Sequence, residues 1–241
     1  MWHKERGIVL GTVRHNDKSS IIHIFTEGNG HVPYVLYAAT GNKGARRNTI
    51  TQPLTIIEFE SRIVPSDTLQ HLKEPCNIMP FKDIPFNPVK SSIALLLGEF
   101  LTYSLREESE NRPLFSFIAN AISEFDKLEN AGNFHLYFIL KVIGYLGIGP
   151  NTDNYQPGCW LDMRDGTFPS IQPPHYDLIQ PDHAYKTVLL MQSENAQEAS
   201  KTAMTGSERA GLLNCLNDYL RMHIPGFPVL KSIEVLQTVF N

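Results

Sequence analysis

Hydrophobic residues follow two different spacings along this chain of 241 residues. Up to residue 82 they form short β-branched runs separated by turn residues, which is the pattern of strands. The runs lie at residues 7–14, 20–26, 31–37, 54–60 and 69–73. Five short strands in such a segment predict a small barrel of the five-stranded OB type, and an SH3-like barrel would produce a similar pattern.

After Pro85 the apolar residues recur at helical spacing. Asn87 followed by Pro88 is typical of a helix start, and the segment from Thr205 to Glu208 resembles a capping box. Helices are expected at 88–105, 113–125 and 134–146, from about 184, after 205, and at 230–240. We therefore expect an α+β protein with two domains, an OB-fold barrel at 1–82 and an all-α domain at 83–241.

Residues 150–181 interrupt the helical domain with six prolines. The sequence Arg164-Asp165-Gly166 predicts a tight turn, so we expect a small hairpin within this irregular insertion. Four potential metal ligands also occur in this region: Cys159, Asp162, His175 and His183. Their spacing matches no zinc module and only one of them is a thiol, so we expect no metal.

The composition is that of an ordinary globular protein, with 42% hydrophobic and 19% charged residues. The three cysteines, Cys76, Cys159 and Cys215, lie far apart, which favours a reducing compartment over a disulfide scaffold. The first residues contain no apolar signal-peptide core, and the apolar run at 93–97 is too short to span a membrane. We expect a soluble cytoplasmic protein with no membrane partner.

Charge is unevenly distributed, although the net charge is only -4. Residues 1–82 contain ten Lys or Arg against seven Asp or Glu, and no acidic residue occurs between Glu27 and Glu58. This window contains a polar loop with three basic residues, Lys43, Arg46 and Arg47. A basic loop on a small barrel is a common means of holding single-stranded nucleic acid, and a loop that is merely solvated is the alternative.

Other residues of the barrel could extend this basic surface. Arg14 and Lys18 flank the first turn, and Lys73 lies on the last strand. Tyr34 and Tyr37 are candidate stacking rings for bases. Because residues three apart on a regular strand point to opposite faces, at most one of the two can serve this purpose.

The sequence contains no motif of a nucleotide-binding loop, a nucleophile elbow or a zinc protease. A hydrolytic cluster could be drawn from four residues near the first turn, Asp17, Ser19, Ser20 and His23. Alternation along a strand would point them to different faces, so we expect no enzymatic activity and no cofactor.

The helical faces at 91–146 are expected to form core. The alternative is a groove for an acidic peptide tail, bordered by Lys90, Arg112 and Lys141.

An ordered series of short segments resembles the RecO family of bacterial recombination mediators. In the barrel region the series comprises GIVLGTVR (7–14), NDKSSI (16–21), FT (25–26), TQPL (51–54) and LKE (72–74). In the helical region it continues with PVKS (88–91), EFL (99–101), LF (114–115), NFH (133–135), LG (146–147), KS (231–232) and VL (235–236). The series covers nearly the whole chain and is most similar to the Bacteroides-type branch, and no single segment is diagnostic.

The resemblance implies an N-terminal OB fold, a helical C-terminal domain and a non-enzymatic role in DNA repair and recombination. It implies binding of single- and double-stranded DNA, annealing of complementary strands, and recognition of the acidic C-terminal tail of single-stranded DNA-binding protein (SSB). It also implies that the protein works with RecR to load RecA onto SSB-coated DNA, in the nucleoid region of the cytoplasm. The positions that correspond to the family's DNA face are Arg14, Lys18, Lys43, Arg46, Arg47 and Lys73.

The sequence departs from the family in one respect. Many members carry a four-cysteine zinc module in the helical domain, whereas only Cys159 remains in that region here. We therefore expect the insertion at 150–181 to be a metal-free remnant of that module. The alternative to a DNA-binding mediator is an adaptor that binds only proteins, namely acidic peptide tails held by the helical domain.

Overall fold

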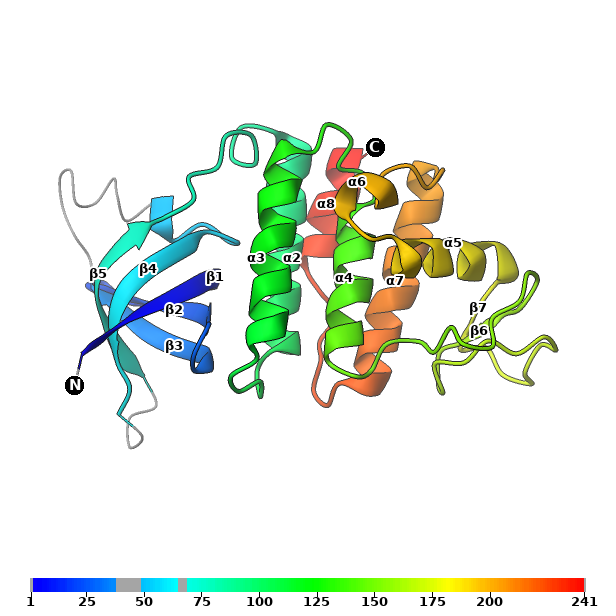
Figure 1. The fold of residues 1–241 in the computed structure, drawn as a ribbon, viewed down its shortest axis with the longest axis horizontal. Helices are drawn as coiled ribbons and strands as arrows, with labels where there is room; N and C mark the ends of the chain where they lie inside the picture. Colours follow the sequence, from blue (N-terminus) through cyan, green and yellow to red (C-terminus); the bar gives the residue numbers. More distant parts are fainter. Residues whose placement is uncertain (1, 38–48, 65–68, 241) are drawn as a thin grey trace. The chain divides into compact units, whose positions relative to one another are not determined.

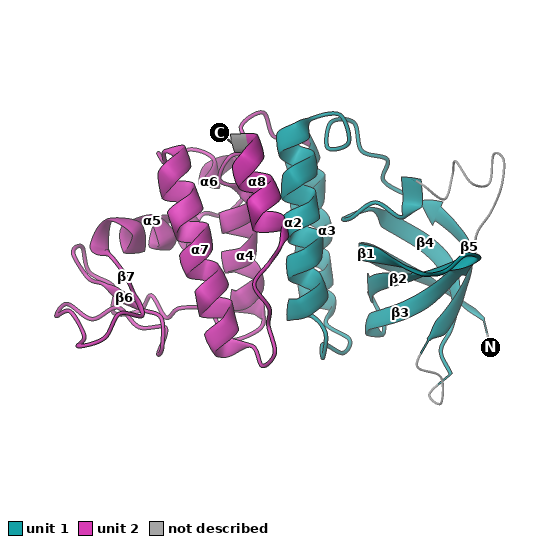
Figure 2. Ribbon diagram, turned by 180° about the vertical axis from the view of Figure 1, so that it is seen from behind, with its two compact units in different colours: residues 1–126 teal, residues 127–241 magenta. Residues whose placement is uncertain are grey.

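The computed structural model describes residues 2–37, 49–64 and 69–240, without the side chain of residue 240. The chain forms two compact units, residues 1–126 and residues 127–241 (Figure 2). Unit 1 contains the strands of the barrel followed by two long helices (Figure 1). Unit 2 contains the remaining helices and a very short two-stranded sheet.

Five strands close into a barrel in the order β1-β2-β3-β5-β4. Their bounds are β1 (His3–Asn16), β2 (Ser19–Thr26), β3 (Gly30–Tyr37), β4 (Ile56–Arg62) and β5 (Gln70–Asn77). All neighbouring pairs are antiparallel except β3 and β5, which run parallel where the barrel closes. This connectivity confirms the predicted five-stranded OB barrel.

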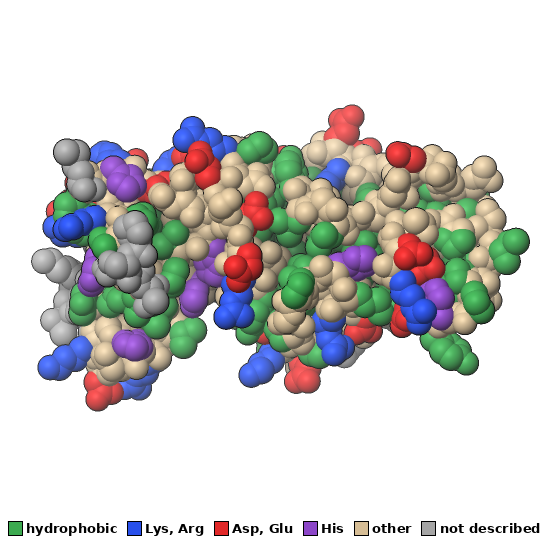
Figure 3. Space-filling view, turned by 90° about the horizontal axis from the view of Figure 1, so that it is seen from below, with side chains coloured by type: hydrophobic (Ala, Val, Ile, Leu, Met, Phe, Trp, Pro, Cys, Tyr) green, Lys and Arg blue, Asp and Glu red, His purple; other side chains and the backbone are tan. Residues whose placement is uncertain are grey.

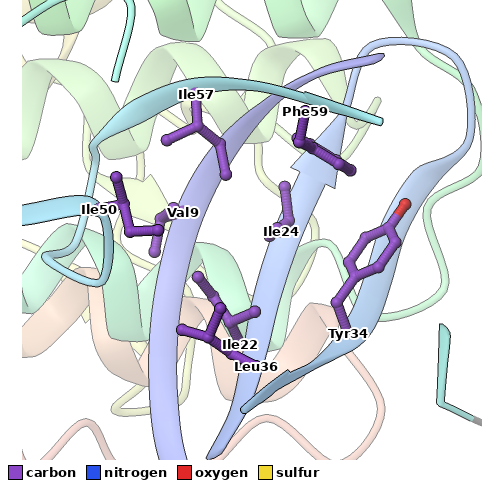
Figure 4. Close-up of a cluster of buried hydrophobic side chains, with 8 residues drawn as sticks. All are labelled: Val9, Ile22, Ile24, Tyr34, Leu36, Ile50, Ile57 and Phe59. Atoms are coloured by element: carbon purple, nitrogen blue, oxygen red, sulfur yellow. The ribbon is translucent and has the colours of Figure 1, made fainter. Parts of the chain in front are cut away.

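Alternate residues of the strands point into the barrel and form its apolar core. The buried members are Val9, Ile22, Ile24, Tyr34, Leu36, Ile50, Ile57 and Phe59 (Figure 4). Tyr34 is completely buried, and its ring packs edge-on against Phe59 with 5.2 Å between ring centroids. Its hydroxyl oxygen lies 3.0 Å from Oγ of Ser61. Of the two candidate stacking rings, Tyr34 is therefore excluded, because it belongs to the core.

Two helices, α2 (Pro88–Ser104) and α3 (Arg112–Lys127), follow the barrel. Asn87 caps α2 as predicted, since its side-chain oxygen accepts hydrogen bonds from the backbone N–H groups of Val89 and Lys90. The chain changes from strands to helices near residue 82, but the compact unit extends to Asp126. The helix α2 belongs to the same unit as the barrel because it packs very closely on β1. A Cβ atom at Gly98 of α2 would lie 2.4 Å from the backbone oxygen of Leu10.

Unit 2 contains five helices among the residues that the structure describes. They are α4 (Phe134–Tyr145), α5 (Pro181–Gln192), α6 (Ala196–Ala199), α7 (Gly206–His223) and α8 (Ser232–Phe240). Buried residues occur all around α4, as expected for a central helix. The predicted capping box at the start of α7 is confirmed, because Thr205 and Glu208 exchange side chain to backbone hydrogen bonds.

The predicted hairpin in the insertion forms only in part. Backbone hydrogen bonds join Asp162 to Thr167 and Trp160 to Pro169 around the expected turn. The two-residue strand β6 (Leu161–Asp162) meets the segment after the turn only in the isolated bridge between Asp162 and Thr167, and it pairs along its length with β7 (Leu178–Ile179). Proline at position 169 has no N–H group, so the hairpin cannot continue there as a regular ladder. Within the described residues, no helix is long and apolar enough to cross a membrane.

Candidate nucleic-acid interface

An aromatic ring and a histidine stack on the outer face of the barrel, where β3 meets β5. Because Tyr34 and Leu36 point inward, Tyr37 points outward, and 57% of its surface is exposed. The parallel pairing sets Val35 opposite His71, which brings the rings of His71 and Tyr37 together. Their planes differ by 9° and their centroids lie 6.4 Å apart. The ring pair is therefore parallel, offset and open to solvent.

Two cations lie beside this ring pair. Arg62 is the partner of His71 in the β4–β5 register, and Lys73 follows His71 by two residues, so all three side chains share the outer face. The ammonium of Lys73 sits 4.0 Å from the centroid of the Trp2 ring, a cation–π contact. We call Tyr37, Arg62, His71 and Lys73 the β3–β5 stripe. Figure 3 shows Lys, Arg and His side chains distributed over the barrel.

The charges of the stripe are not neutralised by the described part of the chain. Arg62 and Lys73 form no ion pair with any described residue, although Glu60 is the register partner of Lys73. By contrast, Lys4 pairs with Glu58 at 3.4 Å and Arg6 pairs with Glu27 at 2.7 Å. The stripe can therefore offer positive charge to phosphates, together with a ring face on which a base can stack.

The structure places the predicted DNA-contacting residues at several positions. Arg14 and Lys18 are exposed at the β1–β2 turn, where Arg14 pairs with Asp17 at 2.5 Å and Lys18 has no ion pair among the described residues. Lys73 belongs to the β3–β5 stripe. The basic loop with Lys43, Arg46 and Arg47 lies outside the described residues.

Sequence reasoning missed Arg62, His71 and Trp2. Alternation along 69–73 could have placed His71 on the same face as Lys73, but nothing local shows that this face adjoins Tyr37. Arg62 lies at the end of β4, and its proximity to His71 depends on the β4–β5 pairing.

The three residues assigned to a tail-binding groove occupy different environments. Lys90 is 2% exposed, and its ammonium contacts Asp83 at 2.6 Å and the backbone oxygen of Asp126 at 3.0 Å. It therefore stabilises unit 1 and does not border a groove. Arg112, on α3, is exposed and pairs with Glu110 at 2.7 Å. Lys141 lies in unit 2.

The ammonium group of Lys141 is partly buried and has a hydrogen-bond partner within unit 2. It donates a hydrogen bond of 2.7 Å to the backbone oxygen of Met191 and lies near the ring of Tyr137. Burial lowers the pKa of Lys141, while Glu198 partly restores it. This side chain bonds to α5 and is only partly available for a ligand.

Three of the four potential metal ligands in the insertion, Cys159, Asp162 and His175, make ordinary polar contacts. His175 Nε2 lies 3.1 Å from a carboxylate oxygen of Asp162, and the sulfur of Cys159 lies 3.5 Å from the hydroxyl of Ser170. In the described part of the chain, no three His, Cys, Asp or Glu residues come together in a way that could hold a metal ion.

The fold and the stripe define the class of this protein. It is an OB-fold protein of two units, in which a barrel with a basic and aromatic stripe is followed by a helical region. Comparison with known families gives the more specific identity. Residues 1–79 match the family model described as Recombination protein O N terminal, and residues 85–232 match Recombination protein O C terminal. The chain therefore belongs to the RecO family, which confirms the resemblance.

Relatives with similar sequences over their whole length support this assignment. The chain is 40% identical to the DNA repair protein RecO of Phocaeicola vulgatus, with 100% of both chains covered. It is 39% identical to the protein of the same name from Bacteroides fragilis, again over 100% of each chain. Identity to DNA repair protein RecO of Flavobacterium johnsoniae is 31%, over 99% of both chains. The branch is thus the one that the sequence indicated, and the family is one of DNA repair proteins.

Proposed function

We propose that this protein is a DNA-binding recombination mediator. It binds single- and double-stranded DNA, anneals complementary strands, and acts with RecR to load RecA on DNA coated with SSB. Membership of the RecO family supports the general role. The observation that carries the DNA-binding part is the β3–β5 stripe, where the un-neutralised Arg62 and Lys73 flank the stacked rings of Tyr37 and His71.

The geometry suits single strands in particular. Strands 2 and 3 of an OB barrel and the loop between strands 1 and 2 are the usual surfaces for oligonucleotides. Lys18 lies on that loop and Tyr37 lies at the end of β3. Cations neutralise the phosphates while the exposed ring accepts an unpaired base, which a duplex keeps inside its stack.

Annealing follows from charge neutralisation and needs no nucleotide hydrolysis. Two complementary strands repel each other through their phosphates, and each releases counterions when it binds a cationic protein surface. Holding both strands on one protein, or on adjacent copies, raises their effective concentration and favours pairing.

Fluorescence anisotropy of a labelled single-stranded oligonucleotide, titrated at several salt concentrations, tests the proposal. Each phosphate contact contributes about -0.7 to the slope of log affinity against log salt. Lys18, Arg62 and Lys73 together should therefore give a slope of about -2 or steeper. The variant Lys4→Gln serves as a control, because Lys4 already pairs with Glu58. Absence of binding at low salt would favour the adaptor that binds only proteins.

The basic loop is tested separately. We expect that the double variant Arg46→Glu and Arg47→Glu binds DNA more weakly, because it reverses two positive charges, and that its melting temperature is not lowered. Equal affinity of variant and wild type would show that the loop has no role in binding. A strand-annealing assay on the same variants then connects DNA binding to the mediator function.

For the SSB tail, a cavity in unit 2 is a better candidate than the groove that the sequence offered as an alternative to core. The cavity has a volume of about 310 Å³, and apolar Leu213 and Leu236 line it together with Ser207, Arg209 and His135. Arg209 brings positive charge to the cavity, and one of its N–H groups donates to the backbone oxygen of Met204. Apolar walls beside a guanidinium suit an acidic tail that ends in an apolar residue.

Binding of an acidic peptide with a free terminal carboxylate tests this assignment. We expect the variant Arg209→Gln to weaken peptide binding at least several-fold, whereas Arg221→Gln leaves binding unchanged, because Arg221 lies elsewhere on α7 and is exposed beside Asp218. If both variants bind the peptide as the wild type does, the tail docks at another site.

A further inference from the structure

Two histidines meet on the outer face of the barrel, at the end of β3 opposite to Tyr37. His23 Nδ1 and His31 Nε2 lie 3.1 Å apart, and the ring centroids are separated by 5.3 Å. The pairing of β2 with β3 sets His23 opposite Pro33 and His31 opposite Phe25, so the histidines are diagonal neighbours. Both side chains are partly buried. A bond between two imidazoles can form only when one ring nitrogen donates and the other accepts.

The histidine pair and Arg106 form a cluster of two nitrogen bases and one cation. Burial lowers the pKa of both histidines, and the positive charge of Arg106 lowers both further. The pKa of His31 falls to about 4 although the Leu105 backbone carbonyl, which accepts its hydrogen bond, acts in the opposite direction. At neutral pH both rings are therefore uncharged in the protein without ligand.

The elements packed around the pair contribute no compensating carboxylate contact among the described residues. On β1 the residue opposite His23 is Gly11, which has no side chain, and the nearby Thr102 of α2 is neutral. On the turn after α2, the backbone oxygen of Glu108 accepts from the N–H of His31, while its carboxylate accepts from Asn111. Arg106 is the charged side chain whose positive charge acts on both rings. An anion is the ligand that such a cluster favours.

The histidine cluster and the β3–β5 stripe lie on the same outer face of β3. His31, Pro33, Val35 and Tyr37 share the outer face of β3, because Val32, Tyr34 and Leu36 point into the core. Six residues separate His31 from Tyr37, which corresponds to about 20 Å along the strand. A single strand that stacks a base at Tyr37 and follows β3 would thus bring a later phosphate to the histidines.

We propose that His23, His31 and Arg106 form a second phosphate contact for single-stranded DNA, which takes up a proton from solvent when the phosphate docks. This inference rests on the proposed DNA-binding function and specifies how that binding is regulated. The phosphate stabilises the charged imidazole, so an imidazole that is neutral in the free protein becomes protonated in the complex. Linkage then requires that DNA affinity rises as pH falls.

The affinity for a labelled single-stranded oligothymidylate, measured at constant ionic strength between pH 5.5 and 8, tests the proposal. If one proton is taken up, the affinity rises up to about tenfold for each pH unit by which the pH falls. This gain applies between the pKa of the imidazole in the DNA complex and its lower pKa in the free protein. The double variant His23→Gln and His31→Gln should lose this dependence and keep the affinity of the wild type at pH 8. The variant His15→Gln, which removes an exposed histidine of β1, should retain the wild-type pH dependence.

A second variant keeps the test decisive if the double variant does not fold. Arg106 is exposed, so Arg106→Gln should fold normally, bind DNA more weakly and reduce the salt slope by about 0.7. A pH dependence that is equal in the wild type and the histidine variant would overturn the proposal, as would an unchanged salt slope for Arg106→Gln. If the wild type binds no DNA at any pH, the proposed function itself fails. If it binds with an affinity independent of pH, only the histidine contact fails.

Discussion

Removal of the Tyr37 ring is the sharpest test of the β3–β5 stripe. Tyr37 is 57% exposed, and its ring stacks on His71 on one side. One ring face at most is therefore left for a base, and the substitution Tyr37→Ala should remove the stacking of a single base. Stacking contributes about 1–3 kcal/mol per base, which corresponds to a loss of affinity of about 5- to 150-fold.

The salt dependence distinguishes stacking from charge. Because Tyr37→Ala removes neither a Lys nor an Arg, it should leave the slope of log affinity against log salt unchanged, while Tyr37→Phe should bind nearly as well as the wild type. Anisotropy titrations with single-stranded oligothymidylate measure both quantities. Tyr145→Ala, which removes a half-exposed ring from α4 in unit 2, is the matched control. If Tyr37→Ala binds within about twofold of the wild type, the stacking role of the stripe is refuted.

Three further changes test the charge of the stripe and the stability of unit 1. Arg62→Gln should reduce the salt slope of single-strand binding by about 0.7, and an unchanged slope would mean that Arg62 contacts no phosphate. Gly98→Ala should lower the melting temperature by several degrees despite the better helix propensity of Ala, because its Cβ would clash with the Leu10 backbone oxygen, at a cost of about 1–3 kcal/mol. A melting temperature equal to or above that of the wild type would contradict this close packing. Burial opposes ionisation of Asp126, but hydrogen bonds from the backbone N–H groups of residues 82–84 and the charge of Lys90 hold its pKa below the usual value of an aspartate. The stabilisation from ionised Asp126 is complete above the pKa of this group in the unfolded chain, and it is lost as the pH falls through the lower pKa in the folded protein. Below about pH 4 the melting temperature of Asp126→Asn should therefore decrease less with falling pH than that of the wild type.

Local patterns in the sequence were sufficient to predict the strands and helices and the type of barrel that the strands form. The β-branched runs predicted all five strands, and Asn87 and the Thr205 capping box marked helix starts that the structure confirms. These signals are local, because alternation, capping and turn formation depend on residues within a few positions of one another. The predicted hairpin around 164–166 forms only in part, since β6 pairs along its length with residues 178–179.

Burial separated residues that look alike in the sequence. Tyr34 and Tyr37 are three positions apart, yet one lies in the core and the other on the surface. Lys90 was named as a border of the alternative groove, and it is buried against Asp83 and the Asp126 carbonyl. A charged side chain is buried when partners from distant parts of the chain converge on it, and the spacing of residues along a helix does not reveal such partners.

The sequence by itself determined the strands, the helices, the alternation of side chains along each strand, and the family to which the chain belongs. Tertiary structure alone decided which outward-facing residues act together. Tyr37 and His71 stack because β3 and β5 pair in parallel where the barrel closes, and Arg62 joins them through the β4–β5 register. His23 and His31 meet through the β2–β3 register, and Arg106 approaches them because the turn after α2 folds back onto β3. The two histidines are only eight residues apart and need only the pairing of β2 with β3, whereas the other contacts join residues far apart in the chain and arise only when the barrel has closed and the turn after α2 has packed on it.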